Sequence, residues 1–101
     1  MVKAQITVTI QPAKTGGSGT ITVGTTPTRI MEKTTSIKAV AIKADDDNTG
    51  NIYVGFSEEV SEANGFKLAK GQFIEININD LSKIYLVGSA SNQKVHYIWV
   101  T

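Results

Sequence analysis

The sequence consists largely of short runs in which apolar and polar residues alternate, each ended by glycine, proline, asparagine or aspartate. In residues 72–78, for example, Ile74, Ile76 and Ile78 occupy every second position. Successive side chains of a β-strand point to opposite faces, so a period of two predicts a strand with one buried face. About eight such runs follow one another along the chain. The sequence therefore predicts an all-β protein.

Short strands separated by turn signals are typical of a β-sandwich or barrel. We expect one domain over residues 1–101, an antiparallel, jelly-roll-like β-sandwich of about eight short strands with little or no helix. Residues 57–64 alone favour a helical turn, because Ser-Glu-Glu suits a first turn and Asn-Gly a stop. A chain of this length buries roughly 65% of its unfolded surface, which is enough for one modest core.

The N-terminal residues 1–10 form one alternating run. Its apolar face includes Ile6, Val8 and Ile10. Residues 11–19 follow, and their Gly-Gly-Ser-Gly ending has the composition of a flexible segment. This segment is either a long hairpin loop or a hinge that lets the first strand pack on a neighbouring subunit. The sequence leaves both alternatives open.

The last predicted strand, residues 94–100, is apolar on both faces. Tyr97 and Trp99 fall on one face. Ile98 and Val100 fall on the other. A small sandwich hides one such face in its own core, and covering a second face usually takes another chain. We therefore expect a homo-oligomer, with a trimer favoured, and take as interface candidates Ile6, Val8, Ile10, Tyr97 and Trp99.

Composition excludes several classes of partner. Ten Lys and Arg residues against nine Asp and Glu leave a net charge of +1, with a single arginine, which argues against nucleic-acid binding. No run approaches the ~18 apolar residues of a membrane span, and the N-terminus lacks the apolar core of a signal peptide. We therefore expect no membrane partner and synthesis in a host cytoplasm. The absence of cysteine rules out disulfides and thiolate metal sites.

The Asp-Asp-Asp-Asn-Thr-Gly-Asn segment at residues 45–51 is the sharpest candidate for a metal site. Asp45, Asp47 and Thr49 stand at alternate positions before a glycine, as oxygen ligands do at the start of a calcium loop. The twelfth position, where a bidentate glutamate is needed, is Phe56. We therefore expect a solvated hairpin turn, in which Asp and Asn side chains bond their own backbone, and no bound metal.

The chain carries no recognisable catalytic set, and we expect neither an enzyme nor a cofactor. His96 is the only histidine, and its spacing reveals no carboxylate partner for general-base work. No Gly-x-Ser-x-Gly motif is present. The alternative function is carbohydrate or receptor binding, as in a receptor-binding fibre or an adhesin. Its candidate aromatic residues are Tyr53, Tyr85, Tyr97 and Trp99.

Four sequence segments resemble small β proteins encoded among the structural genes of tailed bacteriophages. These segments are Thr25-Thr-Pro-Thr-Arg29, Ile42-Lys-Ala-Asp-Asp-Asp-Asn-Thr-Gly-Asn-Ile-Tyr-Val-Gly55, Asn64-Gly-Phe-Lys-Leu-Ala-Lys-Gly-Gln72 and Leu81-Ser-Lys-Ile-Tyr-Leu-Val-Gly-Ser89. The resemblance spans about residues 25–100. One departure is Lys70, which stands where these relatives often carry proline.

The resemblance implies a non-enzymatic virion protein, such as a capsid decoration protein or a small head- or tail-associated protein. Proteins of this kind are commonly β-sandwiches that trimerise on the particle. The expected partners are further copies of the chain and the major capsid protein or another virion protein. The family has no established catalytic residues, so the resemblance implies none in this chain.

Overall fold

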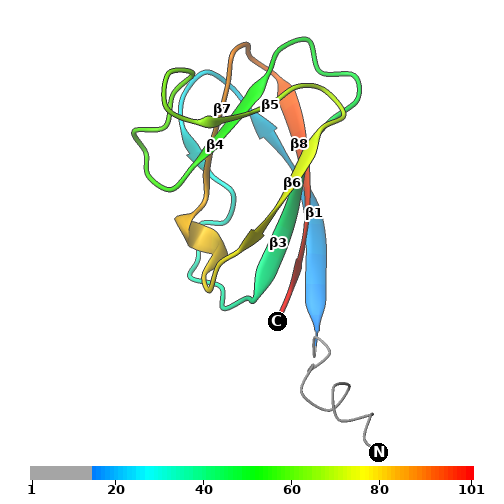
Figure 1. The fold of residues 1–101 in the computed structure, drawn as a ribbon, viewed down its shortest axis with the longest axis vertical. Coiled ribbons are helices and arrows are strands. Elements are labelled where there is room, and N and C mark those ends of the chain that lie inside the picture. Colours follow the sequence, from blue (N-terminus) through cyan, green and yellow to red (C-terminus); the bar gives the residue numbers. More distant parts are fainter. Residues whose placement is uncertain (1–14) are drawn as a thin grey trace, which may run out of the picture.

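The computed structural model describes residues 15–101, which fold into two four-stranded antiparallel sheets (Figure 1). The strand order is β1-β8-β3-β6 in one sheet and β2-β7-β4-β5 in the other. The strands are β1 (Gly16–Val23), β2 (Thr28–Arg29), β3 (Ala39–Ala44), β4 (Ile52–Gly55), β5 (Phe66–Leu68), β6 (Phe73–Asn77), β7 (Tyr85–Gly88) and β8 (Gln93–Val100). The predicted all-β sandwich of eight strands is confirmed.

This strand order is that of a jelly roll, in which the chain passes repeatedly from one sheet to the other. Among strands adjacent in sequence, only β4 and β5 pair with each other. The acidic turn after β3 is therefore a connection between sheets, and its prediction as a hairpin turn is wrong. The last two strands, β7 and β8, likewise lie in different sheets.

The core lies between the sheets and is almost entirely aliphatic. The inward-facing positions of β3 and β4, including Ile42 and Ile52, are fully buried. A short 3₁₀ helix, η1 (Leu81–Lys83), closes one end of the sandwich, where Leu81 and Ile84 are also fully buried. Asp80 caps this helix, because its Oδ1 accepts hydrogen bonds from the backbone of Thr35 and from Ser82.

Two short elements differ from the sequence expectations. Residues 57–64 form successive turns without a helix, held by bonds such as Val60 N–H to Ser57 O. The single helical turn in the described residues is η1 instead.

Gly71 has a positive φ of 80°, as its place in the turn before β6 predicts. No helix in residues 15–101 is long and apolar enough to cross a membrane.

Strand β1 begins at Gly16, so residues 16–19 belong to a strand and not to the flexible loop that their composition predicts. The reason lies in β8, which runs beside β1. The ring of Trp99 would lie 2.6 Å from a Cβ on Gly17, and the hydroxyl of Tyr97 would lie 2.6 Å from a Cβ on Gly19. The glycines therefore make room for two aromatic side chains that cover the strand.

Candidate functional site

Several polar groups of the acidic turn between β3 and β4 form hydrogen bonds within the fold. Asp45 Oδ2 accepts the Asp47 N–H at 3.0 Å, as in an Asx turn. Asn48 is buried, and its side chain bonds both the N–H and the C=O of Lys94. No group of three or more His, Cys, Asp or Glu residues in the described part of the chain is placed to hold a metal ion. Asp45, Asp47 and Thr49 therefore act as parts of a turn.

A buried glutamine completes this network from the start of β8. Gln93 is only 1% exposed, yet its amide makes three hydrogen bonds. The oxygen accepts the Gly50 N–H at 2.8 Å, while the nitrogen donates to Thr49 Oγ1 and to the Ser91 carbonyl. The acidic turn is thus fastened to β8, which explains how an exposed, highly polar loop holds one conformation.

His96 has a carboxylate partner that sequence spacing did not reveal. Its Nε2 lies 2.6 Å from Asp45 Oδ1, and its Nδ1 lies 3.0 Å from Thr20 Oγ1. Because an ionised carboxylate only accepts, Nε2–H donates to Asp45. This hydrogen bond, with the smaller contribution of the Asp47 N–H, lowers the pKa of Asp45 below its ordinary value.

The chain of hydroxyl, imidazole and carboxylate has the residue types of a catalytic triad, but it lies on the outer face of a sheet. A nucleophilic hydroxyl also needs N–H donors aimed at the developing oxyanion. Thr20 and His96 are paired across the ladder of β1 and β8, where backbone N–H groups lie in the plane of the sheet. What the arrangement does in this structure is join β1, β8 and the acidic turn by hydrogen bonds.

The four aromatic residues proposed for carbohydrate binding do not share a face. Tyr97 and Trp99 turn inward from β8 and pack against the core cluster. Tyr53 and Tyr85 belong to a separate cluster on the other sheet, with Val60 and Val87. A sugar ring stacks on aromatic residues that face it together, so this set does not form a joint binding surface.

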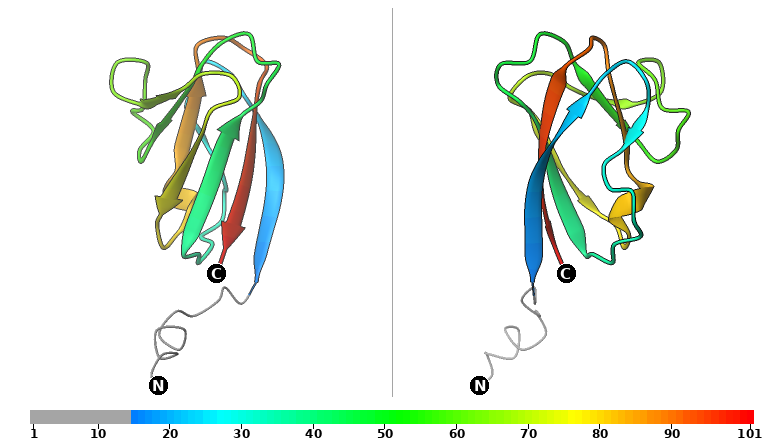
Figure 2. Two further views of the ribbon diagram at one scale, coloured as in Figure 1. Left: turned by 45° about the vertical axis from the view of Figure 1, so that its right-hand side comes forward. Right: turned by 180° about the vertical axis from the view of Figure 1, so that it is seen from behind.

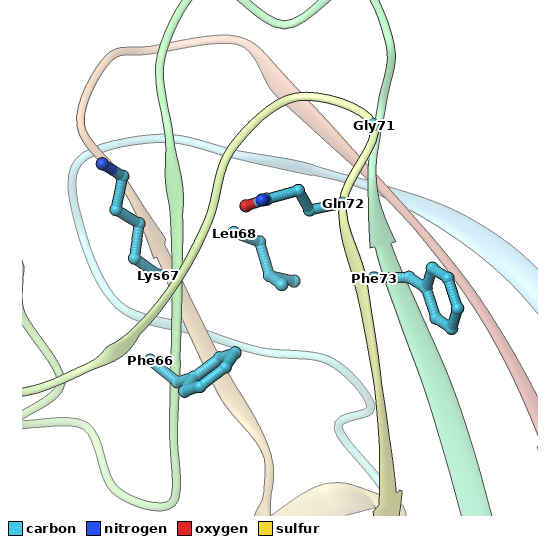
Figure 3. A pocket seen from close by; sticks show the side chains of 6 residues that line it. All are labelled: Phe66, Lys67, Leu68, Gly71, Gln72 and Phe73. Atoms are coloured by element: carbon cyan, nitrogen blue, oxygen red, sulfur yellow. The ribbon is translucent and has the colours of Figure 1, made fainter.

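The exposed aromatic residues are the three phenylalanines of the chain. Phe56, Phe66 and Phe73 are 63%, 56% and 66% exposed. Phe66 and Phe73 line one open groove beside the edges of β5 and β6, with Leu68 and Gln72 between them (Figure 3). Phe66 also lines a second groove together with Phe56. Exposed phenylalanines that share grooves in this way are a candidate interaction surface.

A second apolar area lies on the outer face of the β1-β8-β3-β6 sheet. Ile98 and Val100 are exposed there, and the small side chains of Ala39 and Ala41 lie beside them on β3. Together with Glu75 and Asn77 of β6 they line a shallow groove. The expectation that one face of β8 stays outside the core is therefore fulfilled by Ile98 and Val100.

The structure separates the predicted interface residues into two groups. Tyr97 and Trp99 are half-buried on the inner face of β8, over Gly19 and Gly17. Ile6, Val8 and Ile10 lie outside the described residues. The interface role of all five stays a prediction.

Sequence reasoning missed the phenylalanine surface. Alternation continued from Ile52 and Val54 predicts Phe56 on their face, but β4 ends at Gly55, so Phe56 falls in the loop beyond it. Phe73 was correctly placed opposite Ile74, although its exposure could not be read from alternation alone. One signal was present, because Phe73 shares its face with the polar Glu75 and Asn77.

Comparison with known proteins supports the fold assignment. No protein-family model matches the sequence, and a search of curated proteins found no match. The structure is similar to that of Bacillus endospore appendages, which form a family of disulfide-linked pili, with a TM-score of 0.54 and 17% identity over 86% of this chain and 85% of that chain. It is also similar to the SPBc2 prophage-derived protein YomS, with a TM-score of 0.54 and 14% identity over 91% of this chain and 100% of that chain. At these identities the likeness shows a shared fold.

Proposed function

We propose that this chain is a non-enzymatic structural subunit that associates with further copies of itself into a symmetric trimer on the surface of a virion. Capsid decoration is the specific role that we propose. The observation that carries the proposal is the exposure of all three phenylalanines beside the open edges of β5 and β6. Single exposed apolar residues are normal, whereas adjoining ones mark a contact surface.

The nature of the polar groups supports the same function. His96 and Asp45 are the residues best suited to acid-base chemistry, and they bond to each other on the outer surface of a sheet. His96 also bonds to the hydroxyl of Thr20 on a neighbouring strand. Their arrangement fastens the fold and offers no cavity in which a substrate would be held away from water. A protein that binds a repeated surface through many copies gains avidity from multivalency and needs no single strong site.

The structural neighbours favour an assembly role as well. One is a subunit of pili and the other is a prophage protein, so the same fold is found in an assembly and in a viral setting. The pili are disulfide-linked, whereas this chain contains no cysteine. Contacts between its copies must therefore be noncovalent and depend on buried apolar surface and backbone pairing.

Sedimentation velocity of the purified chain at micromolar concentration tests self-association. We expect a discrete oligomer with the mass of a trimer, and a stable monomer would overturn the proposal. Copy counting by mass spectrometry of purified virus particles tests the location. A fixed number of copies per capsid is the expected result for a decoration protein, and absence from the particle would refute that role.

A further inference from the structure

Strand β6 is an edge strand that is paired on one side only in residues 15–101. It pairs only with β3, as the left view of Figure 2 shows, where β6, β3, β8 and β1 lie side by side. Its inward-facing residues Ile74 and Ile76, and Ile78 just beyond, are only half-buried. The opposite sheet ends in β5, which has three residues against the five of β6. An edge of this kind is a template for a further strand.

The backbone pairing identifies the groups that such a strand would meet. The N–H of Ala44 donates to the C=O of Gln72 at 2.9 Å, which sets the alternation of the ladder between β3 and β6. Ile74 and Ile76 therefore bond to β3. Phe73, Glu75 and Asn77 then turn their backbone N–H and C=O groups towards the free edge.

We propose that residues 2–10 of a second copy of this chain add to the free edge of β6 as an antiparallel strand. The proposal rests on the self-association proposed above and names the contact that produces it. Residues 2–10 have the matching pattern, because their apolar positions would continue the row of half-buried isoleucines over the core. Those apolar positions are Val2, Ala4, Ile6, Val8 and Ile10.

The polar faces of the two strands also match in charge. With the apolar residues turned inward, the other face of residues 2–10 lies beside Phe73, Glu75 and Asn77 on the outer surface. Lys3 is the only charged residue on that face of the donated strand. Glu75 is the only charged residue of β6. The two charges are opposite, which favours the pairing at the rim of the contact.

With Ile10 opposite Phe73, the chain's own segment falls just short of this edge, so a donor from another copy fits it better. The register places Gly16 and Asn77 at one end of the sheet, and Thr20 and Phe73 one level further along. A strand beyond β6 lies about 19 Å across the sheet from β1. An antiparallel partner of β6 runs in the direction of β1, so its last residue, Ile10, lies about 13 Å further along. The straight-line distance from Ile10 in the added strand to Gly16 is therefore about 23 Å. The six residue steps between them span at most about 22 Å when fully extended, and the path around the sheet is longer than the straight line.

The alternative within one chain is a hairpin in which residues 2–10 return along β1. The β1 edge offers less apolar surface for a strand to cover, because its inward positions Gly17 and Gly19 already lie beneath Trp99 and Tyr97. Donation to β6 of the next copy is a head-to-tail contact, and such contacts close into a ring when the rotation between copies allows it. A trimer is the smallest ring of this kind beyond a mutual exchange between two copies.

The test uses paired variants of the full chain in sedimentation velocity. Ile6→Asp should raise the dissociation constant of the oligomer roughly a hundredfold, because it places a charge beside the isoleucines. The neighbouring Thr7→Asp adds the same charge on the outer face and should change it by less than about tenfold. Circular dichroism and melting temperature of each variant confirm that the domain remains folded.

A second pair tests the acceptor strand. Glu75→Pro removes an N–H on the free edge of β6 but none from the ladder to β3, so it should dissociate the oligomer while the monomer stays folded. Glu75→Gln keeps the N–H and removes only the charge, and it should change the dissociation constant by about threefold or less. An oligomer that is insensitive to Ile6→Asp and Glu75→Pro overturns strand donation and leaves self-association standing. A wild-type monomer overturns both.

Disulfide trapping separates donation from the hairpin, because the native chain has no competing thiol. Mixing chains that carry Glu75→Cys with chains that carry Gln5→Cys, Thr7→Cys or Thr9→Cys should give a cross-linked pair for at least one partner position. Chains with both Thr7→Cys and Ser18→Cys report the return along β1. An internal disulfide in these chains, with no cross-link to Glu75→Cys, would overturn the proposal.

Discussion

The two edges of the β1-β8-β3-β6 sheet are finished in different ways. At β1 the inward positions Gly17 and Gly19 are covered by aromatic rings from the neighbouring strand, Ile21 is half-buried and Val23 is fully buried. Thr20 is tied to His96 on the outer face. At β6 the inward positions are isoleucines that stay half-exposed, and Phe73 lies open on the outer face. Both strands are edges in the described residues, but the inward side of β1 is covered largely by the chain's own aromatic rings, whereas β6 leaves apolar side chains partly in water.

Under the proposed self-association, this difference separates the residues expected to serve stability from those expected to serve assembly. An aromatic side chain packed within its own chain contributes to the free energy of folding, whereas an exposed one contributes only when a partner covers it. Trp99 on the β1 side and Phe73 on the β6 side are therefore expected to behave in opposite ways when they are removed.

The largest expected effect is that of Trp99→Ala. The ring is half-buried over Gly17, so its loss should reduce the free energy of unfolding by about 2–3 kcal/mol, less than the roughly 3–5 kcal/mol of a fully buried aromatic. Phe73→Ala should change stability by less than about 0.5 kcal/mol and weaken self-association about tenfold. Urea unfolding and sedimentation of both variants measure this. Equal losses of stability would break the comparison.

The next largest effect is that of Gly17→Ala. A Cβ at this position would lie 2.6 Å from the Trp99 ring, so the ring or the strand must shift, at a cost of about 1–3 kcal/mol. Gly24→Ala is the matched control, because nothing lies within 4 Å of a Cβ there. It should change stability by less than about 0.5 kcal/mol in thermal or urea unfolding. If Gly17→Ala is equally neutral, the glycines are not required by close packing.

Much of the fold could be predicted from the sequence, because strand alternation and turn residues are local signals. The prediction failed where local pattern and three-dimensional packing diverge. The Gly-Gly-Ser-Gly segment has the composition of a linker, and only the rings of Tyr97 and Trp99, about 80 residues away in sequence, explain why it is a strand. The same limit applies to the acidic turn, since alternation does not say whether two strands share a sheet.

The candidate site was less predictable for the same reason. The partners of His96 are Asp45 and Thr20, which are distant in sequence and adjacent only through the register of three strands. The exposure of Phe66 and Phe73 depends on the short length of β5 and the open edge of β6. Such features arise from topology, and a pattern of apolar residues does not encode them locally.

A smaller effect is the pH dependence of stability, which tests the hydrogen bonds that join β1, β8 and the acidic turn. The hydrogen bond from His96 and the Asp47 N–H lower the pKa of Asp45. A pKa lowered by folding adds stability above the unfolded-state pKa of about 4, and this stability is lost as the pH falls through the folded-state pKa. Asp45→Asn should therefore lower the melting temperature at neutral pH, and its difference from wild type should shrink in acid.

Asp80 and Asp46 provide the reference points for that measurement. The pKa of Asp80 is also lowered, by the Thr35 N–H and by Ser82, so both proteins still lose stability in acid. The comparison between wild type and Asp45→Asn removes this shared loss. Asp46→Asn breaks only an exposed contact with Lys43 at 3.4 Å and should hardly change the melting curve. A pH-independent deficit in Asp45→Asn would mean that the ionised carboxylate is not the stabilising form.

The smallest expected effect is that of Thr20→Val, which keeps the shape of the side chain and removes its hydroxyl. The bond to His96 is exposed, and valine is favoured in strands, so stability should change by less than about 0.5 kcal/mol. Thr22→Val, on the same face of β1, serves as the control. Neither variant should alter the oligomer, because the proposed subunit contact lies on β6 and not on β1. Dissociation of the oligomer by Thr20→Val would place a subunit contact on β1 and reverse the roles assigned to the two edges.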